Sequence, residues 1–220
     1  MAKQPAAKKI PEERKAASIA LLSEKGVPVL ESLPTIESED EAGQRSEDEL
    51  RAQILALSMV WLRAHFAATG RPHKEFLRAF EPLRADAEEA LGDTQLAFID
   101  DPRPSDEDTT DALWTIEAIA ALLWAGGLLK KLDWPTTPAD PAALEPLIEA
   151  AIGGEKLHLR STSDLLDQAD LYYRLLWAVV QKQVDGPASP INGSIVYERA
   201  RAFGWLTQPE VEWERVDMTT

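Results

Sequence analysis

The sequence predicts an all-α protein, a single-domain bundle of about six to seven helices around a buried central helix at residues 110–126. Apolar residues recur at helical spacing along most of the chain, and no stretch keeps the strict alternation of a half-buried strand. The hydrophobic fraction of 45% and the seven Trp residues are typical of a packed globule. We expect one helical domain over residues 11–220, preceded by a disordered basic lead-in over residues 1–10.

The N-terminal part of the chain is expected to form one helix followed by connectors. Apolar periodicity predicts a helix over about residues 11–25, which ends near Gly26. Pro28 and Pro34 each lack a backbone donor, so "VPVLESLPTI" is expected to be extended. The following "ESEDEAGQRSEDE" holds seven acidic residues in thirteen, which indicates a solvated loop that leads into the next helix.

Two further helices are expected in the first half of the chain. Ser46 and Glu49 have the spacing of a capping box, which predicts the start of a long amphipathic helix over residues 46–69. Another helix is expected over about residues 72–91, with a distortion at Pro82.

The longest apolar run, residues 112–129, follows a polar and acidic loop expected over residues 92–111. The run approaches the length of a membrane span, but Glu117 lies inside it and Gly126 and Gly127 interrupt it. A central helix buried on all sides therefore explains the run better. Acidic residues ahead of a helix are favoured by its dipole, so they do not by themselves indicate a binding surface.

Three more segments complete the expected bundle. A Pro-rich connector leads to a short helix over about residues 141–151, and a longer helix is expected over about residues 161–183. The last helix is expected at "IVYERARAFGWL". The tail after it has no strong period, and we expect it to pack as an extended arm through Trp213 and Val216.

Two of the predicted helices share a short sequence pattern. "RSEDELRAQILALSMVW" and "RSTSDLLDQADLYYRLLW" both begin with Arg-Ser, continue with an acidic residue, Leu and Gln in the same order, and close on Trp. An internal duplication would explain this pattern, and so would two independent amphipathic helices with ordinary caps. No solenoid-type repeat period is present.

The composition restricts the classes of partner and the chemistry. A formal net charge of −15 repels phosphate backbones and anionic lipids, so we expect no nucleic-acid partner and no membrane partner. The chain has no cysteine, which excludes disulfide bonds, thiol nucleophiles and thiolate metal sites. This composition fits a reducing compartment, and we expect a cytoplasmic protein without cofactors.

Ionisable residues inside the apolar helices are the main candidates for a functional site. An unpaired buried charge costs several kcal/mol, so such groups are paired, shifted in pKa or close to water. Asp170 and Arg174 are four residues apart, on one face of a helix. Glu117 needs a partner from another helix, and Arg160 and Arg199 are the candidates. With nearby aromatic residues, the candidate ionic and aromatic cluster consists of Glu117, Arg160, Asp170, Tyr173, Arg174, Trp177, Tyr197, Glu198, Arg199 and Trp205.

This cluster has two main interpretations. It is either a buried ionic network that sets the register of the helices, or an acid/base site in a helical cleft. A carboxylate-only magnesium site of Glu117, Asp170 and Glu198 is a weaker alternative, because arginines lie nearby. The sequence has no P-loop, no nucleophile elbow and no histidine pair at metal-ligand spacing, so we assign no catalytic residue and expect no metal site.

Several segments, taken in order, resemble the uncharacterised family called domain of unknown function 4272. They are "QRSEDEL", "DALWTIEAIAALLWAGG", "LRSTSDLLDQADLYYRLLWAV", "IVYERARAFGWL" and "WERVDMTT", and they cover the chain from about residue 45 to residue 220. The basic N-terminal segment lies outside this resemblance. The resemblance implies a bacterial-type soluble protein and brings no established activity or catalytic residues.

The leading functional hypothesis is a non-enzymatic helical protein that binds another protein. The acidic surface suits the neutralisation of a basic partner, and the Trp and Tyr residues are of the kind found at interfaces. The alternative is an enzyme or small-molecule-binding protein with a carboxylate and arginine cleft near Asp170 and Glu198. A third hypothesis is that the domain is one piece of an assembly, such as a homo-oligomer.

Overall fold

The computed structural model describes residues 9–185 and 191–220, and it confirms an all-α fold, with no strand in this part of the chain. The disordered lead-in expected over residues 1–10 falls mainly on residues 1–8, which lie outside the described residues. The elements are α1 (Pro11–Glu24), α2 (Glu47–Ala68), α3 (His73–Phe80), the 3-10 turn η1 (Glu81–Leu83), α4 (Arg84–Glu88), α5 (Asp93–Asp100), α6 (Asp106–Ala125), α7 (Pro141–Ile152), α8 (Thr162–Asp185), α9 (Gly193–Thr207) and the 3-10 turn η2 (Trp213–Arg215).

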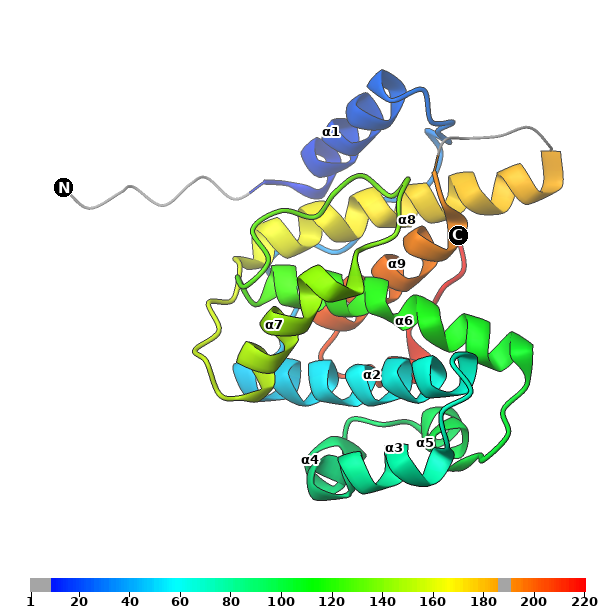
Figure 1. The fold of residues 1–220 in the computed structure, drawn as a ribbon. Coiled ribbons are helices and arrows are strands. Elements are labelled where there is room, and N and C mark those ends of the chain that lie inside the picture. Colours follow the sequence, from blue (N-terminus) through cyan, green and yellow to red (C-terminus); the bar gives the residue numbers. More distant parts are fainter. Residues whose placement is uncertain (1–8, 186–190) are drawn as a thin grey trace.

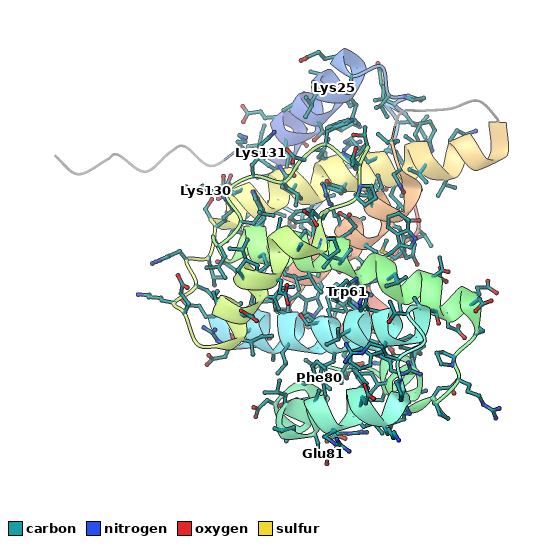
Figure 2. The ribbon with its side chains drawn as sticks, viewed as in Figure 1. Lys25, Trp61, Phe80, Glu81, Lys130 and Lys131 are labelled. Carbon is teal, nitrogen blue, oxygen red and sulfur yellow. The ribbon has the colours of Figure 1, made fainter. Side chains whose placement is uncertain are left out.

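The helices stack in successive layers (Figure 1). α1 covers the outer side of α8, α8 packs on α9, and α9 packs on α6. α2 packs against another side of α6, while the short helices α3, α4 and α5 cover the outer side of α2. α7 contacts both α2 and α6. Figure 2 shows side chains filling the space between these layers, with Lys25 at the end of α1 and Glu81 after α3 at opposite edges of the molecule.

The second half of the central helix, α6, is buried on all sides, as its sequence indicated. Every side chain from Glu117 to Ala125 is buried. The helix begins at Asp106 rather than at residue 110, and the Ser105 hydroxyl caps it by accepting a hydrogen bond from the Asp108 amide (3.0 Å). Acidic residues that we expected in a loop therefore form the first turn of α6, where the helix dipole favours them.

The region between α2 and α6 differs from the prediction in two places. The single helix expected over residues 72–91 is divided at Pro82 into α3, η1 and α4, because proline removes a backbone donor and clashes with the preceding turn. The stretch expected to be a loop contains α5. The Glu214 carboxylate caps α5 by accepting hydrogen bonds from the amides of Thr94 and Gln95 (3.0 and 3.2 Å). This part of the cap is supplied by the C-terminal arm, so the local sequence reveals only the contact of the Gln95 side chain with the Gly92 amide (3.2 Å).

The C-terminal arm packs against the bundle as expected. Trp213 and Val216 are buried, and the Trp213 ring lies edge-on to the Trp205 ring at 6.0 Å. Gly204 allows the close approach of the arm to α9, because an added Cβ there would lie 2.7 Å from Val216 Cγ1. This docking brings Glu214 to the start of α5.

Two arginines that precede helices make equivalent contacts at two places in the fold. Arg45 donates hydrogen bonds to the Trp205 carbonyl (3.1 Å) and to two carbonyls beyond the end of α9, and its guanidinium stacks over the Trp205 ring at 4.3 Å. Arg160 donates to the Trp124 carbonyl (2.8 Å) and to two carbonyls beyond the end of α6, and it stacks over the Trp124 ring at 4.2 Å. The repeated Arg-Ser pattern thus corresponds to a repeated way of closing the C-terminal end of a neighbouring helix.

Candidate functional site

The structure separates the predicted ionic and aromatic cluster into several places, and the first is an ion pair within α8. Asp170 and Arg174 are 0% and 2% exposed, and hydrogen bonds of 3.0 and 2.7 Å join the guanidinium to both carboxylate oxygens. Arg174 also donates to the Pro34 carbonyl (3.0 Å), which ties the N-terminal connector to α8. The half-buried Tyr173 ring lies 6.0 Å from the guanidinium, and Trp177 packs against the core. This pair is enclosed by packing.

The second place is a buried ion pair between α6 and α9. Arg199, one of the two candidate partners of Glu117, approaches its Oε2 with Nε at 3.0 Å and a terminal nitrogen at 2.8 Å. The other oxygen, Oε1, accepts a hydrogen bond from the Ala139 amide (2.6 Å), and Arg199 also donates to the Tyr172 hydroxyl (2.9 Å). Burial raises the pKa of Tyr172, against the opposing effect of the Arg199 charge. Both oxygens of Glu117 thus have partners.

The remaining arginine and tryptophan of the cluster belong to helix ends. The prediction of Arg160 as a partner of Glu117 is wrong, because its guanidinium donates to the carbonyls that end α6. Trp205 is 5% exposed and serves as the surface on which Arg45 stacks. These contacts stabilise the bundle and do not join the ion pairs into one site.

Tyr197 and Glu198 border an open groove of about 940 Å³ between α5, α6, α8 and α9. Trp114, Val180 and Met218 form part of its apolar lining. Val180 and Tyr197 are 45% and 39% exposed, and they are two of the four exposed large hydrophobic side chains among residues 9–181 and 191–220. Exposed apolar side chains gathered at one groove are typical of a binding surface.

Carboxylates also line this groove, which we call the acidic groove. Its charged lining residues are Asp101, Asp108, Asp111, Glu198 and Arg201. Two of them hold local structure, since Asp101 accepts a hydrogen bond from an amide two residues later (2.8 Å) and Asp108 accepts one from the Ser105 hydroxyl (2.6 Å). Asp111 is exposed and Glu198 is buried, and these are the two carboxylates best placed to meet a ligand.

Glu198 is an incompletely paired buried acid. It is 7% exposed, and its Oε2 has no hydrogen-bond partner in the part of the chain that the structure describes. Its Oε1 lies 3.9 Å from Arg201, which donates a hydrogen bond (3.1 Å) to the Tyr197 hydroxyl instead. Loss of hydration raises the pKa of Glu198, Arg201 lowers it, and the charges of Asp111 and Glu117 raise it further.

A second groove, of about 890 Å³, lies between the start of α2, the turn before α5 and the C-terminal arm. Several of its polar groups serve helix ends, although the buried Gln53 Nε2 has no hydrogen-bond partner among the described residues. Glu49 accepts a hydrogen bond from Arg45 (3.0 Å) and caps α2, while Glu214 caps α5. This groove is therefore better explained as a junction of the fold than as a site.

Metal ligation and membrane spanning find no support in the described residues. Among the side chains that the structure describes, no three or more of His, Cys, Asp or Glu are grouped to hold a metal ion. The weaker magnesium alternative conflicts with the geometry, because Glu117 and Asp170 are each paired with an arginine. No helix in this part of the chain combines the length and apolar character that a bilayer crossing requires.

Sequence reasoning missed most members of the acidic groove, among them Asp111, Val180 and Arg201. Val180 ends the apolar stretch "ADLYYRLLWAVV", which is mostly core, and Asp111 was expected in the acidic loop before the central helix. One local signal was available, because Tyr197 and Arg201 are four residues apart and therefore share a helix face.

Comparison with known proteins identifies the family of the chain and no characterised relative. No curated protein and no solved structure matches the chain significantly. The family described as "Domain of unknown function (DUF4272)" matches residues 14–216. The match begins before residue 45, where the sequence resemblance became clear, and so it includes most of α1. The chain therefore belongs to the DUF4272 family.

Proposed function

We propose that the protein binds a basic segment of another protein in the acidic groove. The observation that carries this proposal is the presence of exposed apolar side chains, Val180 and Tyr197, beside carboxylates in one open groove. Burial of apolar surface supplies much of the free energy of protein association, and carboxylates favour a cationic partner. A non-enzymatic role, such as the neutralisation of a basic protein, is consistent with this arrangement.

The overall charge supports the same class of partner. A formal charge of −15 attracts basic proteins and repels acidic ones, which raises the rate of productive encounters. Because exposed charges are screened at physiological ionic strength, binding is expected to weaken as salt is added. The apolar lining of the groove is expected to preserve part of the affinity at moderate salt.

The geometry supports the enzyme or small-molecule alternative less well. That alternative requires one cleft near Asp170 and Glu198, but Asp170 is fully buried and both of its oxygens accept hydrogen bonds from Arg174. Glu198 borders the groove without Asp170. A binding surface therefore accounts for more of the observations than an acid/base pair.

Site-specific photocrosslinking in the native host tests the proposal. A photoreactive amino acid replaces Thr94, which is exposed and lines the groove, or Glu81, which lies at an outer edge of the molecule (Figure 2). We expect a basic protein to crosslink from position 94 and not from position 81. Equal crosslinking from both positions would contradict the proposal.

A matched pair of variants tests the groove itself. Val180→Asp places a charge in the groove, and Leu30→Asp makes the same change at a side chain of similar exposure (45% and 38%) that lies outside the groove lining. We expect Val180→Asp to abolish crosslinking from position 94 and Leu30→Asp to preserve it. If both variants retain the crosslink, the partner does not occupy the groove.

A further inference from the structure

We propose that Glu198 and Asp111 together bind an arginine side chain of the partner. This inference rests on the proposed function and names the group that the acidic groove recognises. The guanidinium would donate hydrogen bonds to the Glu198 carboxylate, which has an unused acceptor, and to the Asp111 carboxylate, between α9 and α6.

Glu198 lacks the full set of hydrogen-bond partners that buried carboxylates ordinarily have. Its side chain is more than nine-tenths buried, lines the acidic groove, and leaves Oε2 without a hydrogen-bond partner among the described residues. A buried acceptor without a partner costs free energy, and more so when it is charged. A donor brought by a ligand would remove this cost, so the site favours a ligand with N–H groups.

The local charges favour a cationic donor. Asp111 lies close enough to raise the pKa of Glu198, and Glu117 on the same helix as Asp111 has the same effect. Arg201 is the opposing cation, but it lies 3.9 Å from Glu198 Oε1 and donates a hydrogen bond to the Tyr197 hydroxyl. Glu198 and Asp111 together carry more negative charge than the Arg201 guanidinium compensates, and a second cation would neutralise the rest.

The aromatic lining favours guanidinium over ammonium. Trp114 and Tyr197 border the groove, and the Arg201 guanidinium already lies 4.9 Å from the centre of the Tyr197 ring. A planar guanidinium stacks on aromatic rings and donates several hydrogen bonds in one plane, whereas an ammonium does so less well. The same protein uses arginine over tryptophan twice in its own fold, at Arg45 and Arg160.

Titration followed by NMR tests the inference without the partner. The probes are Nα-acetyl-arginine N-methylamide, the corresponding lysine compound, and the corresponding citrulline compound, which has nearly the same shape and no charge. We expect the arginine compound to shift the Trp114 indole and Glu198 carboxyl resonances and to bind about tenfold more tightly than citrulline, with lysine between them. Equal binding of arginine and citrulline, or shifts confined to other residues, would overturn the inference.

Two variants link the binding to the named carboxylates. Glu198→Gln and Asp111→Asn are each expected to reduce arginine binding by about tenfold or more, and Asp86→Asn, at an exposed carboxylate of α4, serves as the control. Circular dichroism verifies that each variant is folded. Unchanged arginine binding in folded Glu198→Gln would also overturn the inference.

The two proposals fail in distinguishable ways. If Val180→Asp abolishes the crosslink to the partner but Glu198→Gln and Asp111→Asn leave it intact, the partner binds the groove without using this arginine site. If arginine binds at Glu198 but no basic protein crosslinks from position 94, the site exists and the proposed protein-binding function is wrong.

Discussion

Glu117 and Glu198 are two buried carboxylates on neighbouring helices, and their surroundings differ. Glu117 is 0% exposed, and both of its oxygens accept hydrogen bonds, from Arg199 and from the Ala139 amide. Glu198 is 7% exposed, its Oε2 has no hydrogen-bond partner among the described residues, and it borders the acidic groove. Glu117 thus has a hydrogen-bond partner for each oxygen, whereas Glu198 can still accept a hydrogen bond from a ligand.

The difference teaches that burial alone does not identify a functional acid. A buried carboxylate whose lone pairs are all used contributes to the register of the helices, and removing its partner is costly. A buried carboxylate with an unused lone pair destabilises the fold slightly and gains from a ligand. Stability measurements on matched neutral variants can therefore distinguish the two kinds of residue.

The largest effect is expected for Glu117→Gln. Glutamine has nearly the same shape, but it leaves the Arg199 guanidinium buried without a counter-charge, so we expect a loss of about 3–5 kcal/mol in the free energy of unfolding. Urea denaturation measures this loss. The control is Glu145→Gln, at an exposed carboxylate of α7, for which we expect little change. If Glu117→Gln left the free energy of unfolding unchanged, Glu117 and Glu198 would not differ in their structural role.

Asp170→Asn tests whether the ion pair within α8 behaves like Glu117. Arg174 would lose its bidentate partner and keep the Pro34 carbonyl, so we expect a loss of about 3 kcal/mol. The control has the same spacing on the surface: Glu75→Gln in the exposed pair with Arg71, for which we expect a loss of at most ~0.5 kcal/mol. Equal effects of the two substitutions would show that the α8 pair is not a buried link.

Glu198→Gln is expected to raise the free energy of unfolding near neutral pH, in contrast to Glu117→Gln and Asp170→Asn. The pKa of Glu198 is raised in the folded protein above its ordinary value of 4.5, so the folded state binds the proton more tightly than the unfolded state does. Ionisation of Glu198 therefore lowers stability as pH rises through the folded-state pKa. The variant should be more stable than the parent by about 1 kcal/mol near pH 7, and the gain should vanish below pH 4.5.

Thermal unfolding of the parent and the Glu198→Gln variant at several pH values measures this gain. Comparing the two proteins at each pH removes the contribution of the other titrating groups. A loss of stability near pH 7 as large as that of Glu117→Gln would mean that Glu198 has a structural partner.

The smallest effect is expected for Asp111→Asn. Removing this exposed negative charge should lower the pKa of Glu198, because Asp111 raises it in the parent. Carbon-13 NMR of the Glu198 carboxyl group measures this pKa, and the stability of the fold should change by at most a few tenths of a kcal/mol. An unchanged pKa would place Asp111 too far from Glu198 to share a ligand with it.

Local sequence predicted most of the helices because their signals are local. The Ser46 and Glu49 capping box forms as its spacing indicated, and the apolar run after Glu117 is the buried center of α6. α5 is short, and the carboxylate that caps its first amides, Glu214, comes from the far end of the chain. The pairing of Asp170 with Arg174 was predicted correctly because the two residues are one helical turn apart. The partner of Glu117 is Arg199 rather than Arg160 because of how α9 packs against α6, which the local sequence does not show.

The sequence by itself determined the helical class, the acidic charge, the buried central helix and the presence of ionisable residues among apolar ones. These properties follow from composition and from spacing within a few turns of helix. Tertiary structure alone decided which of those residues are fully paired and which border open space. Hydrogen-bond partners and solvent access depend on segments far apart in the chain, and that is why Glu117 and Glu198 differ in what they can do.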